Sequence, residues 1–325
     1  MASLFQHRLL MTLKQCWALV KAAAVSWQED YAPSMGAALA YYTMFSIAPL
    51  LLIAISVAGL VFGNDAARGE VFEQLEGLMG ATGAKAVEGL LQSVNQPTTG
   101  TLATVIGSGV LVIGATTVFG ELQTSLDRIW RAPARAESSG LWDLLRTRLL
   151  SFGMILCIGF LLMVSLVASA GLAALGKWWT PLFAGWEITL NVVNFLISFS
   201  LITGVFALIY KLMPRVRVEW RDVWVGAAVT AMLFTIGKLL IGLYIGKSGV
   251  ASAFGAAASI VVVMVWVYYS AQIFLMGAEF TWVYAHTFGS LKGRDRPGAA
   301  SAIPKQGESP DAAPSREITD AVKAS

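Results

Sequence analysis

The sequence predicts an all-α integral membrane protein with six transmembrane helices, two cytoplasmic termini and an amphipathic helix near its N-terminus. Three observations predict this class: six long apolar stretches, loops alternately rich and poor in Lys and Arg, and a composition that is 56% hydrophobic but only 13% charged. Soluble domains are about 25% charged. A helix of about 20 apolar residues spans roughly 30 Å of hydrocarbon, and its backbone polar groups bond within the segment.

The six apolar stretches define the predicted domain organisation. They cover residues 35–62, 102–120, 149–175, 188–212, 223–245 and 256–283. Residues 1–34 form a cytoplasmic segment before the transmembrane domain of residues 35–286. Residues 287–325 are rich in Pro, Gly, Ser and charge, so they bury too little apolar surface to fold, and we expect a disordered cytoplasmic tail.

Positive charge sets the expected orientation. One group of loops carries Arg128, Arg131, Arg135, Arg146 and Arg148, then Lys211, Arg215, Arg217 and Arg221, then Lys292, Arg294 and Arg296. The alternate loops carry only Arg68 and Lys85, then Lys177, then Lys247. Short loops rich in Lys and Arg stay in the cytoplasm. We therefore expect a multi-pass protein of the cytoplasmic (inner) membrane with both termini inside.

Two segments outside the spans are amphipathic. In residues 10–27 the apolar side chains recur every three or four positions, which predicts a helix in the cytoplasmic membrane interface. This helix either anchors the first span or senses lipid. Residues 63–100 are too polar to span, and they predict two short helices broken around Gly80 and Gly83 that cap the outer face.

Polar residues inside the spans are the candidate pathway or coupling residues, because charge in a membrane is costly and each case needs a reason. Glu279 and Gln272 lie seven residues apart on one face of the sixth span, and Tyr41 and Tyr42 lie at a similar depth in the first. Glu121, at the cytoplasmic end of the second span, is a candidate to join them. Glu279 either pairs with a loop Arg and fixes the helix register, or serves a solute or proton.

Three further residues complete this set. Pro49 cannot donate to the carbonyl of Phe45, which predicts either a simple kink or a broken helix that lines a cavity. Ser46 is placed to help satisfy that carbonyl. Lys238 lies in the outer half of the fifth span, where its stem can reach water by snorkelling.

Three strings in the sequence carry a family resemblance. They are GAALAYYTMFSIAP at residues 36–49, LDRIW at 126–130 and VWVYYSAQIFLMGAEF at 265–280. With them the chain resembles the YihY/BrkB family of bacterial inner-membrane proteins from about Trp17 to Tyr284. The resemblance implies six membrane helices. Family members have carried ribonuclease BN, virulence or serum-resistance labels, and ion or lipid transport has been proposed for them.

The residues themselves argue against catalysis. The only His residues, His7 and His286, flank the membrane region, and no HxH, HExxH or carboxylate cluster is present to hold a metal. Cys16 and Cys157 provide no CxxC motif, and no nucleotide-binding fingerprint occurs. We therefore expect no enzyme, cofactor or metal, and the net charge of +3 makes nucleic acid a poor partner.

The sequence thus favours translocation of a small solute, an ion or a lipid without ATP hydrolysis in this chain, with the first, fifth and sixth spans lining the pathway. The alternative is a non-transporting scaffold or regulator that organises lipid or envelope proteins. Membrane lipids are the expected partners in both cases. The substrate and its direction stay open, and so does homo-oligomerisation.

Overall fold

The computed structural model describes residues 13–94, 117–133, 186–247, 254 and 257–292, and all structural statements here concern these residues. They form helices and turns, without a strand. The helices are α2 (Leu13–Glu29), α3 (Ala32–Phe62), α4 (Asn64–Val94), α7 (Trp186–Leu212), α8 (Trp220–Lys247) and α10 (Ala258–Thr287). A further helix covers residues 117–129.

Three of these helices are long and apolar enough to cross a membrane, namely Val192–Leu212, Trp220–Ile245 and Ala258–Thr287. The pair Ala32–Ala48 and Leu50–Ser56 adds a fourth if its two parts, which meet at 42°, form one span. The all-helical membrane class predicted from the sequence is therefore confirmed. The predicted span at 149–175 and most of that at 102–120 lie outside the described residues, so the count of six stays a prediction.

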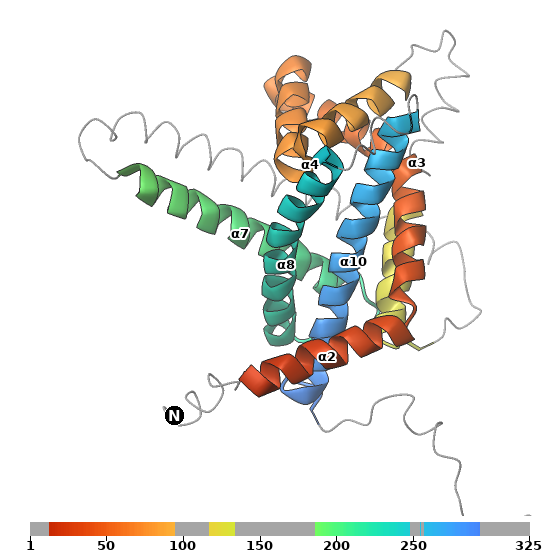
Figure 1. Ribbon diagram of the computed structural model, residues 1–325, viewed down its shortest axis with the longest axis vertical. Helices are drawn as coiled ribbons and strands as arrows, with labels where there is room; N and C mark the ends of the chain where they lie inside the picture. The colour runs from red at the N-terminus through yellow and green to blue at the C-terminus, as the bar shows by residue number, and fades with distance from the viewer. Residues whose placement is uncertain (1–12, 95–116, 134–185, 248–253, 255–256, 293–325) are drawn as a thin grey trace, which may run out of the picture. The chain divides into compact units, whose positions relative to one another are not determined.

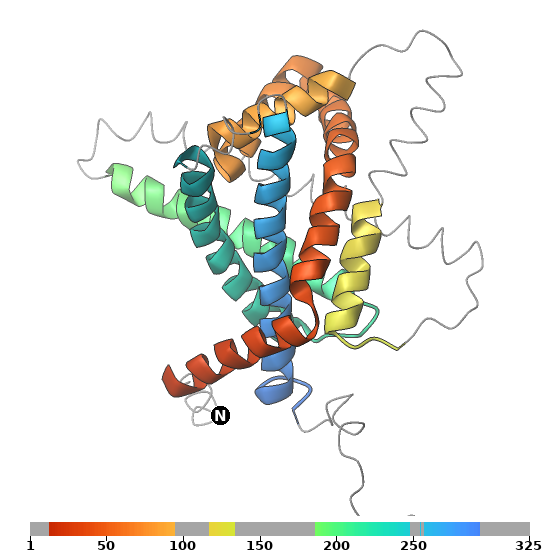
Figure 2. The ribbon, with the colours of Figure 1, turned by 45° about the vertical axis from the view of Figure 1, so that its right-hand side comes forward.

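Helix α10 is the element on which the others pack. It contacts α8 and α3 along its length and α2 and α4 near its ends. In Figures 1 and 2, α10 (blue) runs between α3 and α8, with α2 crossing one end and α4 lying at the other. These ends are called the α2 end and the α4 end below. The sequence of α10 is apolar on every side, as expected for a helix that is surrounded by neighbours.

Small residues and one tyrosine set the close packing in the centre. The hydroxyl of Tyr210 on α7 donates to the carbonyl of Phe274 on α10 at 2.7 Å and lies 3.1 Å from the hydroxyl of Thr230 on α8. A Cβ on Gly277 would lie 2.7 Å from the Tyr210 hydroxyl and would overlap the Thr230 hydroxyl. Three helices therefore meet where only glycine fits.

Polar contacts join the connections at the α2 end. Asp127, in the last turn of the 117–129 helix, pairs with the Arg215 Nε at 2.6 Å and accepts the Arg215 backbone N–H at 2.8 Å. Asp222, in the first turn of α8, accepts the backbone N–H of Ser290 at 3.0 Å and its hydroxyl at 2.6 Å. These bonds hold the α7–α8 connection against the 117–129 helix and hold the end of α10 against the start of α8.

The two amphipathic segments differ in how they pack. On α2, Leu19 and Ala23 are buried in the core, whereas Trp17 is 71% exposed and Val20 is also exposed. The part of the predicted apolar stripe at Trp17 and Val20 thus points away from the bundle, whereas Trp27 at its other end packs against the core. Helix α4 leaves helical geometry at Gly80 (φ 76°, ψ 168°), where the sequence predicts a break. A positive φ of this kind is adopted readily only by glycine.

Candidate intramembrane polar site

Gln272 and Glu279 lie two turns apart on α10, so their side chains leave the helix on one face. The side-chain amide of Gln272 packs against Gly36 of α3. A Cβ on Gly36 would overlap the Gln272 Nε2 atom, so this glycine makes room for the amide. Both polar atoms of the amide are buried, and neither bonds to a described residue.

Glu279 is the most unusual residue of the described bundle. Its side chain is 0% exposed, and no described N–H or hydroxyl group donates to its carboxyl oxygens. The one described side chain within hydrogen-bonding reach is the Asp30 carboxyl, which can accept from a protonated Glu279. Its neighbours along α10, Leu275, Ala278 and Trp282, are buried apolar residues. Buried polar groups in proteins are almost always hydrogen-bonded, so an exception of this kind indicates either function or a missing ligand.

Three charged residues act electrostatically on the Glu279 carboxyl. Asp30 and Glu29 act as like charges, and Arg131 acts as an opposite charge. Asp30 is half-buried in the turn between α2 and α3. Arg131 follows the 117–129 helix with a left-handed backbone (φ 49°), and its guanidinium lies 4.8 Å from the centre of the Trp282 ring. The buried carboxyl therefore lies at the meeting point of three elements near the α2 end.

The sequence predicts either an ion pair or a solute or proton site at Glu279. Glu279 makes no ion pair with any described residue, so the pair with a loop Arg that would fix the helix register is not formed within the described part of the chain. The sequence also predicts that Glu279 faces a hydrated cavity open to the cytoplasm, because a carboxylate within a span must face protein or water. In the described arrangement the Glu279 side chain has no exposed surface, and the hydrated cavity stays a prediction.

The candidates on α3 lie along its first half. Tyr41 is more than half exposed and makes edge contacts with the rings of Tyr42 (5.6 Å) and Phe45 (5.0 Å). The hydroxyl of Tyr42 makes no hydrogen bond to Gln272 or to any other described residue. The structure thus places Tyr41 and Tyr42 on α3 without bonding them to the α10 pair.

Pro49 and Ser46 shape the middle of the same helix. The 42° bend between Ala32–Ala48 and Leu50–Ser56 falls at Pro49, as expected for a proline inside a helix. The hydroxyl of Ser46 donates to the carbonyl of Tyr42 at 2.8 Å. Pro49 leaves the Phe45 carbonyl without its helical donor. Ser46 is expected to bond to that carbonyl, but it donates to the carbonyl of Tyr42, three residues earlier.

Lys238 and Glu121 lie apart from the buried carboxyl. Lys238 is half-buried on α8 and makes no hydrogen bond or ion pair with a described residue, which suits a side chain that extends along apolar surface. Glu121 is half-buried on the 117–129 helix. It is not among the charged residues that act on Glu279, so the described geometry does not join these two carboxylates.

Sequence patterns did not single out Asp30, Gly36 or Arg131 as parts of this site. Asp30 is separated from Glu279 by most of the chain, and only the packing of α2, α3 and α10 brings the two together. Gly36 begins the first of the three family-like strings, which is the one available signal. Among the described residues, no group of three His, Cys, Asp or Glu side chains could hold a metal ion.

The long apolar helices and the enclosed carboxyl define an α-helical membrane protein with a polar site inside its bundle. The chain belongs to the virulence factor BrkB family, whose family model matches residues 23–302. This confirms the resemblance seen in the sequence.

Several curated relatives are named as membrane proteins. A UPF0761 membrane protein of Vibrio parahaemolyticus is 30% identical over 85% of each chain, and one of Tolumonas auensis is 28% identical over 85% of this chain and 91% of its own. A relative from Pseudomonas aeruginosa is 27% identical over 77% of this chain, which spans only 58% of that protein. No solved structure matches the chain.

Proposed function

We propose that this protein is a six-span inner-membrane protein with cytoplasmic termini that translocates a small solute, an ion or a lipid, and that Glu279 couples this movement to a proton. One observation carries the proposal: the Glu279 carboxyl is fully enclosed, and no described N–H or hydroxyl group donates to it. No ATP hydrolysis in this chain is required, because a coupled proton supplies the driving force.

The energetic argument concerns the charge state of this carboxyl. An ionised carboxylate without hydrogen bonds in an apolar site costs several kcal/mol. The group therefore holds a proton in the enclosed arrangement and releases it only when water or a cation reaches it. Asp30 acts on Glu279 as a like charge and is half-buried. It is thus a suitable acceptor through which the proton reaches the α2 end.

Opening the site requires α3 to move relative to α10. The Gly36–Gln272 contact lies on the interface between these helices, two turns of α10 deeper than Glu279. The bend at Pro49 divides α3, so its first half can move without the second. Movement of this half would carry the α2–α3 turn with Asp30 away from Glu279. The site would then be hydrated from the α2 end.

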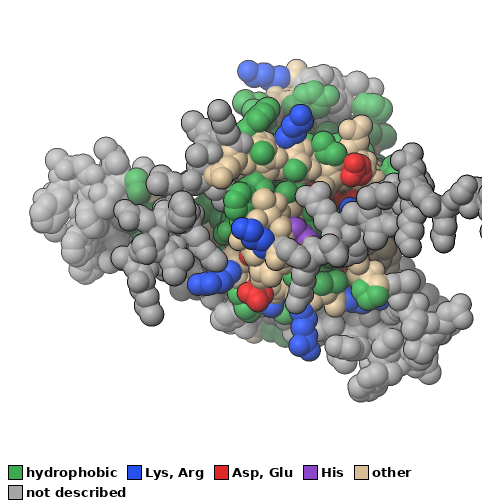
Figure 3. All heavy atoms as spheres, turned by 90° about the horizontal axis from the view of Figure 1, so that it is seen from below, with side chains coloured by type: hydrophobic (Ala, Val, Ile, Leu, Met, Phe, Trp, Pro, Cys, Tyr) green, Lys and Arg blue, Asp and Glu red, His purple; other side chains and the backbone are tan. Residues whose placement is uncertain are grey.

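The expected orientation rests on the distribution of charge. Figure 3, which views the molecule from the α2 end, shows Lys and Arg side chains spread over that face. Arg128 and Lys211 lie in the last turns of their helices at this end, and Arg131 and Arg215 lie in the connections that follow them. The positive-inside rule then favours a cytoplasmic α2 end and an outer α4 end.

One observation favours the alternative, a scaffold that organises lipid or envelope proteins without transport. The exposed side of α2 carries Trp17, Val20 and Val25, with Lys21 beside them. Such a surface fits a helix that lies in the membrane interface. It would serve a scaffold as well as a transporter, so it does not by itself decide between the two functions.

Reconstitution in liposomes tests the proposal. The full chain is reconstituted with an internal pH-sensitive dye, and proton movement is measured while Na⁺, K⁺ or a fluorescent phospholipid is offered in parallel. Glu279→Gln should abolish proton-coupled movement, whereas Glu70→Gln, a half-buried carboxyl on α4, should preserve it. If Glu279→Gln retains wild-type flux and pH dependence, Glu279 is not a coupling residue, and the scaffold function is favoured.

A further inference from the structure

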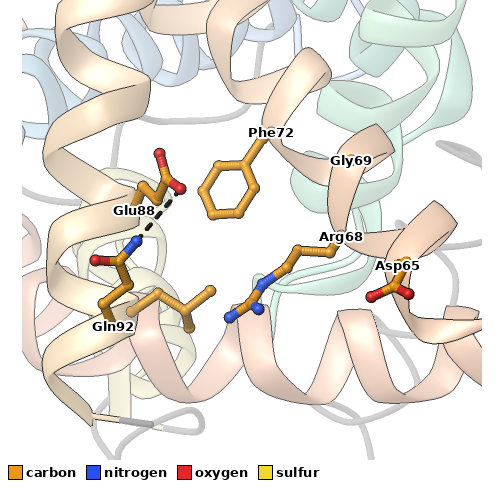
Figure 4. A pocket seen from close by; sticks show the side chains of 7 residues that line it. Asp65, Arg68, Gly69, Phe72, Glu88 and Gln92 are labelled. Atoms are coloured by element: carbon orange, nitrogen blue, oxygen red, sulfur yellow. Dashed lines mark hydrogen bonds between the residues drawn. The ribbon is translucent and has the colours of Figure 1, made fainter.

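Helix α4 contains a cavity that is separate from the polar site on α10. Its volume is about 270 Å³, and its lining comes from α4 alone. The lining residues are Asp65, Arg68, Gly69, Phe72, Glu88, Leu91 and Gln92. Figure 4 shows the guanidinium of Arg68 extending into the space between the two arms of the helix, with the ring of Phe72 beside it.

The fold of α4 creates this cavity. Gly80 interrupts the helix, so the arm before it and the arm after it face each other. Residues 65, 68, 69 and 72 recur at three- and four-residue spacing and present one face of the first arm, while residues 88, 91 and 92 present one face of the second. Phe72 and Leu91 pack with Ile55 of α3, which gives the cavity an apolar wall.

Opposite charges line the cavity without neutralising each other. Arg68 makes no ion pair with a described residue, although Asp65 and Glu88 line the same space. Glu88 accepts a hydrogen bond from the Gln92 amide at 3.4 Å, which orients its carboxylate. A guanidinium binds phosphate or carboxylate through paired N–H donors. A carboxylate in turn binds an ammonium group.

We propose that this cavity binds an ethanolamine phosphate group, which carries a phosphate and an ammonium a few atoms apart. The phosphate would bind Arg68, the ammonium would bind Glu88 on the opposite arm, and the carbon atoms would contact Phe72 and Leu91 (Figure 4). The volume of about 270 Å³ is large enough for a group of this size.

A ligand with a single charge fits less well. The lining contains one cation and two carboxylates, so a simple anion would meet repulsion from Asp65 and Glu88. A simple cation would meet Arg68. The same chemistry has two sources, the headgroup of phosphatidylethanolamine and a free phosphoethanolamine compound. The exposed Leu60 near the end of α3 offers apolar surface for a lipid chain.

Native mass spectrometry of the full chain in detergent micelles tests this proposal. Phosphatidylethanolamine and phosphatidylglycerol of the same chain length are added in equal amounts, and glycerophosphoethanolamine is titrated as the soluble competitor. The wild type should retain phosphatidylethanolamine preferentially. Arg68→Gln should reduce that adduct about tenfold, corresponding to about 1.4 kcal/mol. Arg221→Gln, an exposed arginine on α8, should leave it unchanged.

A second variant separates the two charges. Glu88→Gln should weaken binding of phosphatidylethanolamine while phosphatidylglycerol binds as well as before or better, because the repulsion of its phosphate is reduced. If glycerophosphoethanolamine displaces phosphatidylethanolamine, the soluble zwitterion is sufficient for binding. If only the lipid binds, the ligand is the headgroup of phosphatidylethanolamine. Equal retention of both lipids by the wild type, or equal adducts in Arg68→Gln and Arg221→Gln, would overturn the proposal. The outcome of this lipid-binding test does not depend on Glu279, so it is distinct from the outcome of the transport assay.

Discussion

Gly36 on α3 and Gln272 on α10 are in such close contact that a Cβ at residue 36 would overlap the Nε2 atom of Gln272. The two helices therefore approach closely where a polar side chain is buried, two turns from Glu279. Because the amide bonds to no described residue, its position depends on the shape of this contact. Residue 36 thus controls where the amide lies.

Gly36→Ala should displace the Gln272 amide while the protein still folds. The overlapping atom is the far end of a flexible side chain, so a rotamer change relieves the clash. We expect a loss of stability of about 1 kcal/mol and a several-fold loss of flux in liposomes. Thermal unfolding and the flux assay measure the two effects.

The matched control is Gly204→Ala on α7, where a Cβ would meet no atom within 4 Å. This variant should unfold and transport like the wild type. If both variants behave alike, the approach of α3 and α10 at residue 36 is not important for flux.

The buried carboxyl of Glu279 gives a prediction about stability. Glu279→Gln keeps the shape of the side chain but cannot ionise. Because no ion pair with a described residue is lost, its thermal stability in detergent should equal or exceed that of the wild type. A fall of about 3 kcal/mol would instead show that a buried ion pair had been broken.

Asp30→Asn tests whether the two carboxyls are coupled. Asp30 acts on Glu279 as a like charge, so the two substitutions together should change stability by less than the sum of the single changes. A coupling of about 0.5 kcal/mol or more in a double-mutant cycle supports direct interaction. Strict additivity would place Asp30 outside the site.

The sequence predicted the elements of the described bundle better than the site within it. Residues 188–212, 223–245 and 256–283 were recognisable because each is a long apolar run, and the break in α4 was recognisable from its glycines. These features depend on local composition. The relation of Asp30 and Arg131 to Glu279 depends on the packing of distant segments, which no spacing rule encodes.

Glu279 itself was predictable for a simple reason, since a carboxylate in an apolar helix is costly and stands out in the sequence. Its enclosure was not predictable. The sequence suggested an opening to the cytoplasm, but whether water reaches the carboxyl depends on the packing of distant segments around it, and its side chain has no exposed surface. Gly36 could not be distinguished from other small residues in the sequence, because its contact with Gln272 depends on the packing of α3 against α10.

The central contact of Gly277 with Tyr210 and Thr230 predicts a strong packing effect. Gly277→Ala would place a Cβ 2.7 Å from the Tyr210 hydroxyl and 2.8 Å from the Thr230 Cβ. We expect a loss of about 1–3 kcal/mol from overpacking, seen as a lower unfolding temperature. Adding Thr230→Ala should recover part of the loss. Gly242→Ala on α8, which meets no atom within 4 Å, should have little effect.

The orientation can be tested with a natural thiol, because Cys16 is exposed on α2. In a Cys157→Ser variant, Cys16 is the only cysteine, and the positive-inside rule places it in the cytoplasm. An impermeant maleimide added to spheroplasts should therefore label it only after permeabilisation. In a variant with both natural cysteines replaced by serine, Ala66→Cys, an exposed position on α4, should be labelled without permeabilisation. Labelling of Cys16 in intact spheroplasts together with protection of residue 66 would reverse the proposed orientation. It would also place the ethanolamine phosphate cavity of α4 on the cytoplasmic side.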